Sequence, residues 1–199
     1  MLAVGKPQLD IFTSSALVLL RVGLHGQVGR FSCVGIDLLQ RGQRTVCRTA
    51  RGLEVGQVLG PADVSESGAS NVDGKVLRRM TPEDELLWGH LRQLGEATYQ
   101  CCAAWLDQQQ LSAVLLEVEP LLDGRTLYFH FLSEVDDEVQ QHLDVLVGLY
   151  EQNVQQSKFA KLLEHGCGPG CGTSQAKNGC GSRGGCAVCK ISGVCAVKS

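Results

Sequence analysis

The first half of the chain alternates short apolar runs with glycine-containing or polar turns. Four runs of six to eight residues have this character, at residues 16–23, 27–34, 45–50 and 53–59. Turn residues such as His25-Gly26, Arg41-Gly42-Gln43 and Arg51-Gly52 separate them. Strands so closely spaced predict a small barrel or a curled sheet. Residues 60–74, rich in Gly, Ser, Asp and Asn, are typical of a surface loop or linker.

A helix is predicted to begin where the pattern changes at Thr81-Pro82. Thr81 can cap the helix, proline suits the first helical position, and the acids that follow favour the positive end of the helix dipole. The apolar residues then recur at helical spacing. They form one predicted stripe of Leu87, Leu91, Leu94, Cys101 and Trp105.

Two apolar runs, residues 113–119 and 125–131, flank Asp123-Gly124 and predict a β-hairpin. Helices are expected at 136–150 and at 158–165, the second capped by Ser157 and ended by Gly166. The predicted fold class is therefore α+β: a small, curled, β-barrel-like N-terminal half, then a helix–hairpin–helix half, then a Cys/Gly-rich tail. We place the boundaries at 1–75, 76–165 and 166–199.

Composition separates the tail from the rest of the chain. Residues 1–165 hold all 21 acids against 14 Lys and Arg, a net charge of −7, whereas residues 166–199 hold four basic residues and no acid. The tail also has nine glycines, six cysteines and no aromatic residue, so it cannot bury enough apolar surface to offset its ordering entropy. Disulfides or a metal could order it instead. With no export signal in the sequence, we expect a cytoplasmic, reducing compartment, which favours a metal.

The tail thiols are the candidate metal ligands. Thiolates bind zinc and iron–sulfur clusters, glycines let the backbone turn around the ion, and nearby Lys and Arg favour the thiolate form. One pair is spaced Cys-x-x-Cys, and which four cysteines would ligate stays open. The candidates are Cys167, Cys171, Cys180, Cys186, Cys189 and Cys195. Two alternatives stand beside metal binding: a thiol–disulfide redox protein that uses these residues, and a flexible tail with incidental thiols.

Other candidate residues have structural explanations. Cys101-Cys102 form a vicinal pair, but Cys101 belongs to the predicted apolar stripe, so core packing is the simpler explanation, as it is for Cys33 and Cys47. His165 is either a further metal ligand or a residue favoured by the helix dipole. His130 is interpreted as structural or surface.

Carboxylates gather on the predicted hairpin at Glu117, Glu119 and Asp123. Paired carboxylates can do acid–base work, but a solvated sheet face is the default interpretation. Asp136, Asp137 and Glu138 are explained as first-turn acids of a helix. The sequence carries no phosphate-binding glycine loop, no Ser/His/Asp signature and no dinucleotide fingerprint. It does not predict an enzyme.

Three stretches together resemble the bacterial RicT/YaaT family, whose members carry the polymerase-suppressor-type (PSP-one) C-terminal domain. They are VGLHGQVGRFSCVGIDLLQRGQRTVCRTARGLEVGQVLG at 22–60, KVLRRMTPEDE at 75–85 and LLEVEPLLDGRTLYFHFLSEVDDE at 115–138. The resemblance covers roughly residues 16–172. Near its end, Cys171 stands close to the place of the family's Pro-Cys-Gly motif. The tail is richer in cysteine than the family pattern, which indicates a divergent branch.

The resemblance implies a cytoplasmic, non-catalytic adaptor that carries an iron–sulfur cluster or zinc on its C-terminal cysteines. It also implies small helical partners like RicA and RicF, and regulation of RNA processing through ribonuclease Y. Direct nucleic-acid contact is expected to be weak or indirect, because the whole chain has a net charge of −3 and the tail of only +4. The longest apolar runs are too short to span a bilayer.

Overall fold

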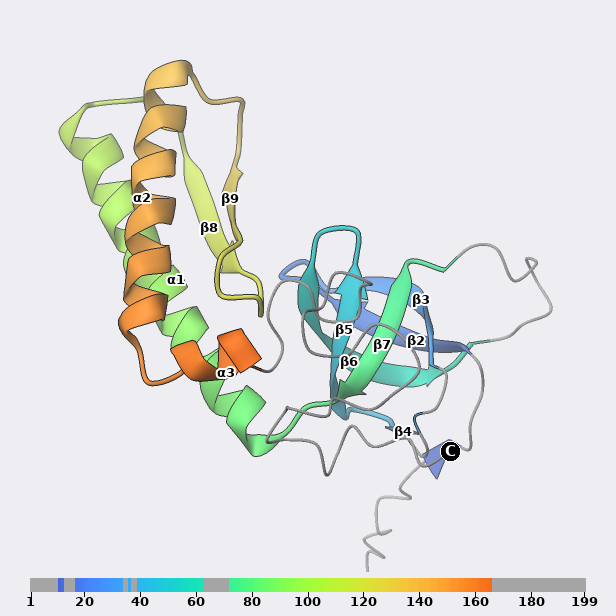
Figure 1. Ribbon diagram of the computed structural model, residues 1–199. Helices are drawn as coiled ribbons and strands as arrows, with labels where there is room; N and C mark the ends of the chain where they lie inside the picture. Colours follow the sequence, from blue (N-terminus) through green and yellow to red (C-terminus); the bar gives the residue numbers. More distant parts are fainter. Residues whose placement is uncertain (1–10, 13–16, 34–35, 37–38, 63–71, 166–199) are drawn as a thin grey trace, which may run out of the picture. The chain divides into compact units, whose positions relative to one another are not determined.

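The structure is a computed structural model that describes residues 11–12, 17–33, 36, 39–62 and 72–165 (Figure 1). The chain forms two compact units. Residues 1–50 and 55–79 make up the first unit, whereas residues 51–54 join residues 80–199 in the second. The second unit is therefore discontinuous in sequence, and each unit is described by itself.

The first unit contains a closed five-stranded barrel in the strand order β2-β3-β7-β5-β6. A short antiparallel pair, β1 (Ile11–Phe12) and β4 (Leu39–Gln40), completes its described strands. The predicted barrel-like N-terminal half is thus confirmed. The barrel strands are β2 (Leu17–Val22), β3 (Gln27–Ser32), β5 (Arg44–Thr49), β6 (Leu53–Pro61) and β7 (Gly74–Arg79).

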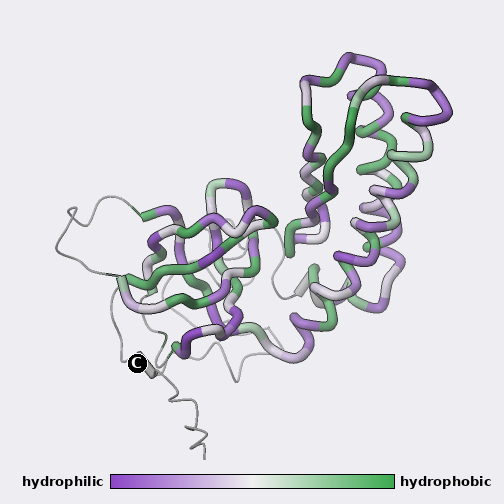
Figure 2. Tube along the Cα trace, turned by 180° about the vertical axis from the view of Figure 1, so that it is seen from behind, coloured by the Kyte–Doolittle hydropathy of each residue, from purple (hydrophilic) through white to green (hydrophobic). Residues whose placement is uncertain are grey.

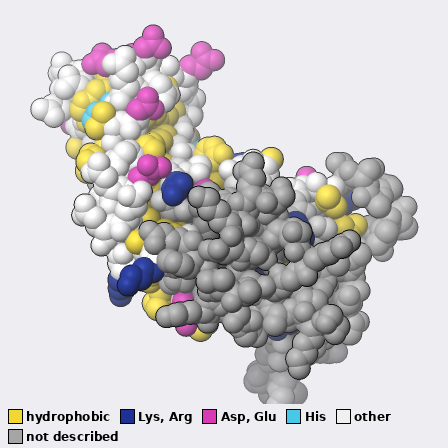
Figure 3. Space-filling model, in the orientation of Figure 1, with side chains coloured by type: hydrophobic (Ala, Val, Ile, Leu, Met, Phe, Trp, Pro, Cys, Tyr) yellow, Lys and Arg dark blue, Asp and Glu magenta, His cyan; other side chains and the backbone are white. Residues whose placement is uncertain are grey.

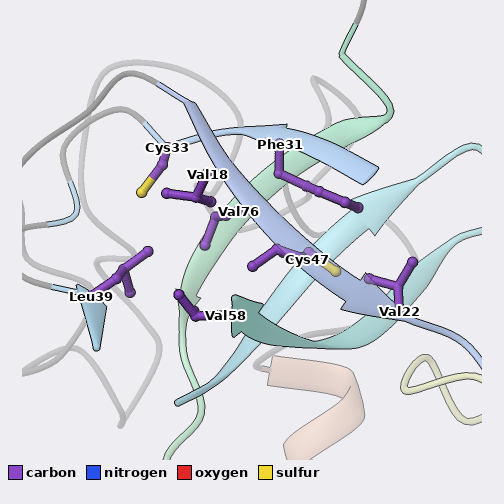
Figure 4. Packing of buried hydrophobic residues seen from close by; sticks show 9 residues of the cluster. Val18, Val22, Phe31, Cys33, Leu39, Cys47, Val58 and Val76 are labelled. Carbon is purple, nitrogen blue, oxygen red and sulfur yellow. The ribbon is translucent and has the colours of Figure 1, made fainter. Parts of the chain in front are cut away.

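Alternation along the strands builds the barrel core. Val18, Leu20 and Val22 of β2 are buried, and the residues between them are half-buried or exposed. Side chains of successive strand residues point to opposite faces, so one face of each strand fills the barrel interior. Figure 4 shows the resulting cluster. It consists of Val18, Leu20, Val22, Phe31, Cys33, Leu39, Cys47, Val58 and Val76.

Strand β7 is the barrel element that the sequence pattern did not predict. It lies between the predicted loop, which ends at residue 74, and the helix predicted to begin at Thr81, and it pairs in parallel with β3 and antiparallel with β5. The short run Val76-Leu77 between charged residues gives a weak strand signal. Its partners lie far away in sequence, so local patterning could not identify it.

The second unit packs two helices against a β-hairpin (Figure 1). Its core joins buried residues of both long helices and of β8, and Figure 2 shows the hydrophobic positions recurring along these elements. The mixed α+β class predicted for the chain is confirmed. The elements are α1 (Pro82–Gln108), β8 (Leu115–Pro120), β9 (Leu127–Phe131), α2 (Asp137–Gln156) and α3 (Ala160–His165).

Side-chain caps define where both long helices begin. Thr81 and Asp84 form a capping box: the Thr81 hydroxyl accepts from the Asp84 N–H at 3.2 Å, and the Asp84 carboxylate accepts from the Thr81 N–H at 2.8 Å. At α2, the Asp136 carboxylate accepts from the Val139 N–H at 2.9 Å. The predicted helix starts are therefore confirmed at both places.

The predicted stripe of α1 is wrong in one position. Cys101 is exposed, whereas Cys102 is fully buried in the core of the unit. The buried face follows four-residue steps from Leu87 to Leu91 and Gly95, then continues through Thr98 and Cys102. Adjacent helical residues differ by about 100° in direction, so only one of the two cysteines can share that face. Cys33 and Cys47 are buried, as predicted.

None of the helices in the described part of the chain is long and apolar enough to cross a bilayer.

Candidate functional site

The predicted metal ligands Cys167, Cys171, Cys180, Cys186, Cys189 and Cys195 all lie outside the described residues. His165 is the last residue of α3. Within the described ranges, no group of three or more His, Cys, Asp or Glu side chains is arranged to hold a metal ion. The metal site therefore stays a prediction. The candidate site among the described residues is instead a cluster of polar side chains.

A polar cluster in the second unit centres on Arg51. Its guanidinium meets Glu119 through two hydrogen bonds, from Nη2 to Oε1 at 2.7 Å and from Nη1 to Oε2 at 3.0 Å. It also donates to both carboxylate oxygens of Glu54, at 3.0 and 3.3 Å. The Tyr128 ring centroid lies 4.6 Å from the Arg51 Cζ, and His130 Nε2 lies 3.1 Å from Glu119 Oε2. We call these five residues the Arg51 cluster.

The two carboxylates of the Arg51 cluster are buried, which strengthens their interaction with the guanidinium. The side chains of Glu54 and Glu119 are 4% and 7% exposed, while that of Arg51 is 31% exposed. The hydrogen bonds to Glu119 raise the pKa of the Arg51 guanidinium above its ordinary value, against the effect of burial, and Glu54 raises it further. The forked guanidinium matches the geometry of two carboxylates at once. The cluster thus holds two buried negative charges in place.

The two hairpin carboxylates of β8 differ in burial. Glu117 pairs with His130 and is exposed, whereas Glu119 pairs with Tyr128, is buried and meets the Arg51 guanidinium. The default interpretation of a solvated face is right for Glu117. It is wrong for Glu119, which needs a distant cation to be buried.

Asp123, also taken for a solvated carboxylate, is buried and shapes the hairpin turn. Its carboxylate accepts from the N–H groups of Arg125 and Thr126, both at 2.9 Å, and from the Thr126 hydroxyl at 2.7 Å. The next residue, Gly124, has φ of +68°. A Cβ there would lie 2.5 Å from Leu163 Cδ1 of α3, so the turn admits only glycine.

Tyr150 of α2 is the largest fully buried side chain beside this turn. Its hydroxyl oxygen has no hydrogen-bond partner among the described residues. Burial raises the pKa of the phenol, and the negative charge of Asp123 raises it further. Tyr150 therefore stays neutral at physiological pH. It packs as an apolar group rather than acting as an acid or base.

The sequence analysis did not identify Arg51 as a site residue. It treated Arg51-Gly52 as a turn and did not connect it to Glu119, 68 residues later. One local signal existed, because Glu54 follows Arg51 by three residues and their side chains pair. The Leu122 N–H also donates to the Leu53 carbonyl at 2.9 Å, so the same short segment bonds to the hairpin through its backbone.

Charge divides sharply between the two units. Residues 1–50 and 55–79 contain nine Lys and Arg against five acids, a net charge of +4. Residues 51–54 and 80–165 contain five against sixteen, a net charge of −11. Figure 3 shows acidic side chains spread over the visible face of the second unit. The small net charge of the chain hides two units of opposite sign.

Part of the chain matches a known protein family. Residues 74–154 match the family described as the PSP1 C-terminal conserved region. The comparisons with curated proteins and with solved structures gave no match. The match starts at the first residue of β7 in the barrel and ends at Val154, a buried residue of α2. The RicT-like assignment is consistent with it. Residues 74–154 of the chain therefore carry a PSP1 C-terminal conserved region.

Proposed function

We propose that this protein is a non-catalytic adaptor of the RicT type, which holds an iron–sulfur cluster or zinc on its C-terminal cysteines. In this proposal it regulates RNA processing through protein partners such as RicA-like and RicF-like subunits and ribonuclease Y. The observation that carries the proposal is the order of two features. The PSP1 region at 74–154 is followed, within the same chain, by a segment with six thiols.

The Arg51 cluster supports a binding role more than a catalytic one. Both carboxylates that could serve as acid or base are committed to Arg51, and Glu119 also contacts His130. A general base must instead reach the proton that it abstracts. The acidic second unit, with its net charge of −11, supplies a surface suited to a basic protein partner.

The chemistry of the cysteines points to the tail as the place for a metal. Cys33 and Cys102 are buried, and burial raises the pKa of both thiols, which favours the neutral form that does not ligate. Cys101 is exposed, but the neighbouring thiol, Cys102, is buried, so the two do not share one accessible face of α1. The tail thiols have glycine and basic neighbours instead, which suits thiolates. Such thiolates would supply soft ligands for zinc or for the iron of a cluster.

Anaerobic purification followed by metal and sulfide analysis tests this proposal. The full chain is compared with a Cys186→Ser/Cys189→Ser variant, which removes the one closely spaced pair. A Cys101→Ser variant is the matched control, because it removes an exposed thiol of α1. We expect stoichiometric iron with sulfide, or stoichiometric zinc, in the wild type and the control, and a loss of at least half of it in the double variant.

Two outcomes contradict the metal proposal. Metal-free protein whose tail thiols oxidise and reduce reversibly would favour the redox alternative. Equal metal content in all three proteins, and also in a chain that ends at His165, would place the metal outside the tail. The adaptor role is tested separately, by mixing the purified protein with RicA-like and RicF-like subunits in size-exclusion chromatography. Elution of each protein at its own volume would contradict that role.

A further inference from the structure

The described part of the first unit is strongly basic. It contains seven arginines and one lysine but a single acid, Asp73. The Asp73 carboxylate accepts from the backbone N–H of Arg30 at 2.8 Å, so it lies directly beside the basic residues. Over its whole sequence, the first unit keeps an excess of four positive charges. The basic residues are Arg21, Arg30, Arg41, Arg44, Arg48, Lys75, Arg78 and Arg79.

Four of these residues form a band around the outside of the barrel. Each lies next to a core residue in sequence: Arg21 beside Val22, Arg30 before Phe31, Arg48 after Cys47 and Lys75 before Val76. Because successive strand residues point to opposite faces, all four occupy outer positions. None of them is buried: Arg21 and Lys75 are exposed, and Arg30 and Arg48 are partly exposed.

The strand order makes this band continuous. Its residues come from β2, β3, β7 and β5, which are successive neighbours in the closed barrel. Lys75 is level with Ser32, two residues from Arg30, and is directly opposite Arg48. Neighbouring strands lie about 4.8 Å apart, so the band follows the surface for about 14 Å. We call Arg21, Arg30, Lys75 and Arg48 the basic band.

Arg48 and Lys75 place two positive charges directly opposite each other on adjacent strands. Like charges in such positions repel each other. A polyanion bound across both side chains would be attracted by both of them. The barrel also uses seven arginines to one lysine, and the guanidinium fork suits phosphate oxygens better than an ammonium does.

We infer that the basic band binds the phosphate backbone of a nucleic acid. This goes beyond the adaptor function, which requires protein partners only. A lipid surface is an outcome that the test must distinguish, because membrane-surface proteins add apolar anchors and Val28, directly opposite Arg21, is exposed. The seven arginines favour the nucleic acid, since their guanidinium forks suit phosphate oxygens. Contacts to phosphate carry no sequence information, so binding is expected to be insensitive to sequence.

Fluorescence anisotropy with a labelled 20-nucleotide single-stranded RNA tests the inference on the full chain. Binding should weaken with salt by a factor set by the number of phosphates neutralised. For four contacts to a single strand, the affinity should fall about 50-fold between 50 and 200 mM salt. In an Arg48→Gln/Lys75→Gln variant, where two contacts remain, it should fall only about 7-fold over the same range.

An Arg92→Gln/Arg125→Gln variant is the matched control. It removes the same charge from exposed positions of the second unit and should keep the wild-type salt dependence. A thermal-unfolding curve of each variant checks that it is folded. A single Lys75→Gln variant checks the effect without altering Arg48.

Four results would overturn the inference. They are no binding at 50 mM salt, an equal effect of the band and control variants, an unchanged salt dependence in the band variant, and binding to anionic vesicles in place of RNA. The Cys186→Ser/Cys189→Ser variant, which tests the metal proposal, should bind RNA like the wild type. A failure of one proposal is therefore distinguishable from a failure of the other.

Discussion

Replacement of Arg51 by methionine removes the cation that two buried carboxylates share. Methionine keeps much of the apolar length of the side chain but leaves Glu54 and Glu119, at 4% and 7% exposure, without the guanidinium. Breaking a buried ion pair from one side costs about 3–5 kcal/mol. The Arg51 side chain is 31% exposed, so solvent screens part of the interaction. We therefore expect the free energy of unfolding to fall by about 2–3 kcal/mol.

Urea denaturation followed by tryptophan fluorescence suits this measurement. Both tryptophans, Trp88 and Trp105, lie in α1, so their signal reports on the second unit. A Glu119→Gln variant and the double variant complete a double-mutant cycle. The coupling energy between Arg51 and Glu119 should be about 1–2 kcal/mol, because their paired hydrogen bonds are close and largely buried.

An Arg125→Met variant controls for the loss of an arginine. Arg125 is exposed in the same unit, so its replacement should change the free energy of unfolding by less than about 0.5 kcal/mol. Equal effects at the two arginines, or strict additivity in the cycle, would refute the account of the Arg51 cluster. Either result would mean that the carboxylates are stabilised by something other than Arg51.

Three further changes probe the second unit. Gly124→Ala should lower the free energy of unfolding by about 2–4 kcal/mol in urea denaturation, since it adds left-handed strain and a clash with α3. Burial lowers the pKa of His142, so the unfolded state binds the proton more tightly and stability falls as pH drops below about 6.5. His142→Phe, which keeps a ring beside Trp105, should lose less stability between pH 7.5 and 5.5; an unchanged pH profile would contradict this. Iodoacetamide should modify Cys101 well before Cys102, whose burial raises the thiol pKa, and peptide mass spectrometry would reveal the reverse order.

Local chemistry explains what the sequence could predict. Thr81 and Asp84, three residues apart, specify a helix start with their own side chains. Asp123 and Gly124 likewise specify a turn, because the carboxylate bonds to backbone N–H groups within three residues of it. Each of these features depends on residues no more than three positions apart, so the order of residue types in the sequence is sufficient to predict it.

Long-range pairing explains what the sequence could not predict. The burial of Glu119 is accompanied by hydrogen bonds from Arg51, 68 residues earlier in the chain. The basic band needs the order of four strands, since its members are scattered from residue 21 to residue 75. The net charge of the whole chain gives no sign of this basic surface, because the second unit carries an excess of acids. The cysteine tail remains a prediction from composition and resemblance.

The segment from Arg51 to Glu54 has a consequence for dissecting this protein. It is encoded inside the barrel sequence, yet it belongs to the second compact unit. An expression fragment cut to residues 74–154 would take β7 away from its barrel and omit Arg51, which donates two hydrogen bonds to Glu119. The stretch that matches the family thus coincides with neither compact unit of the structure. A deletion series or a domain swap should move residues 51–54 together with the hairpin.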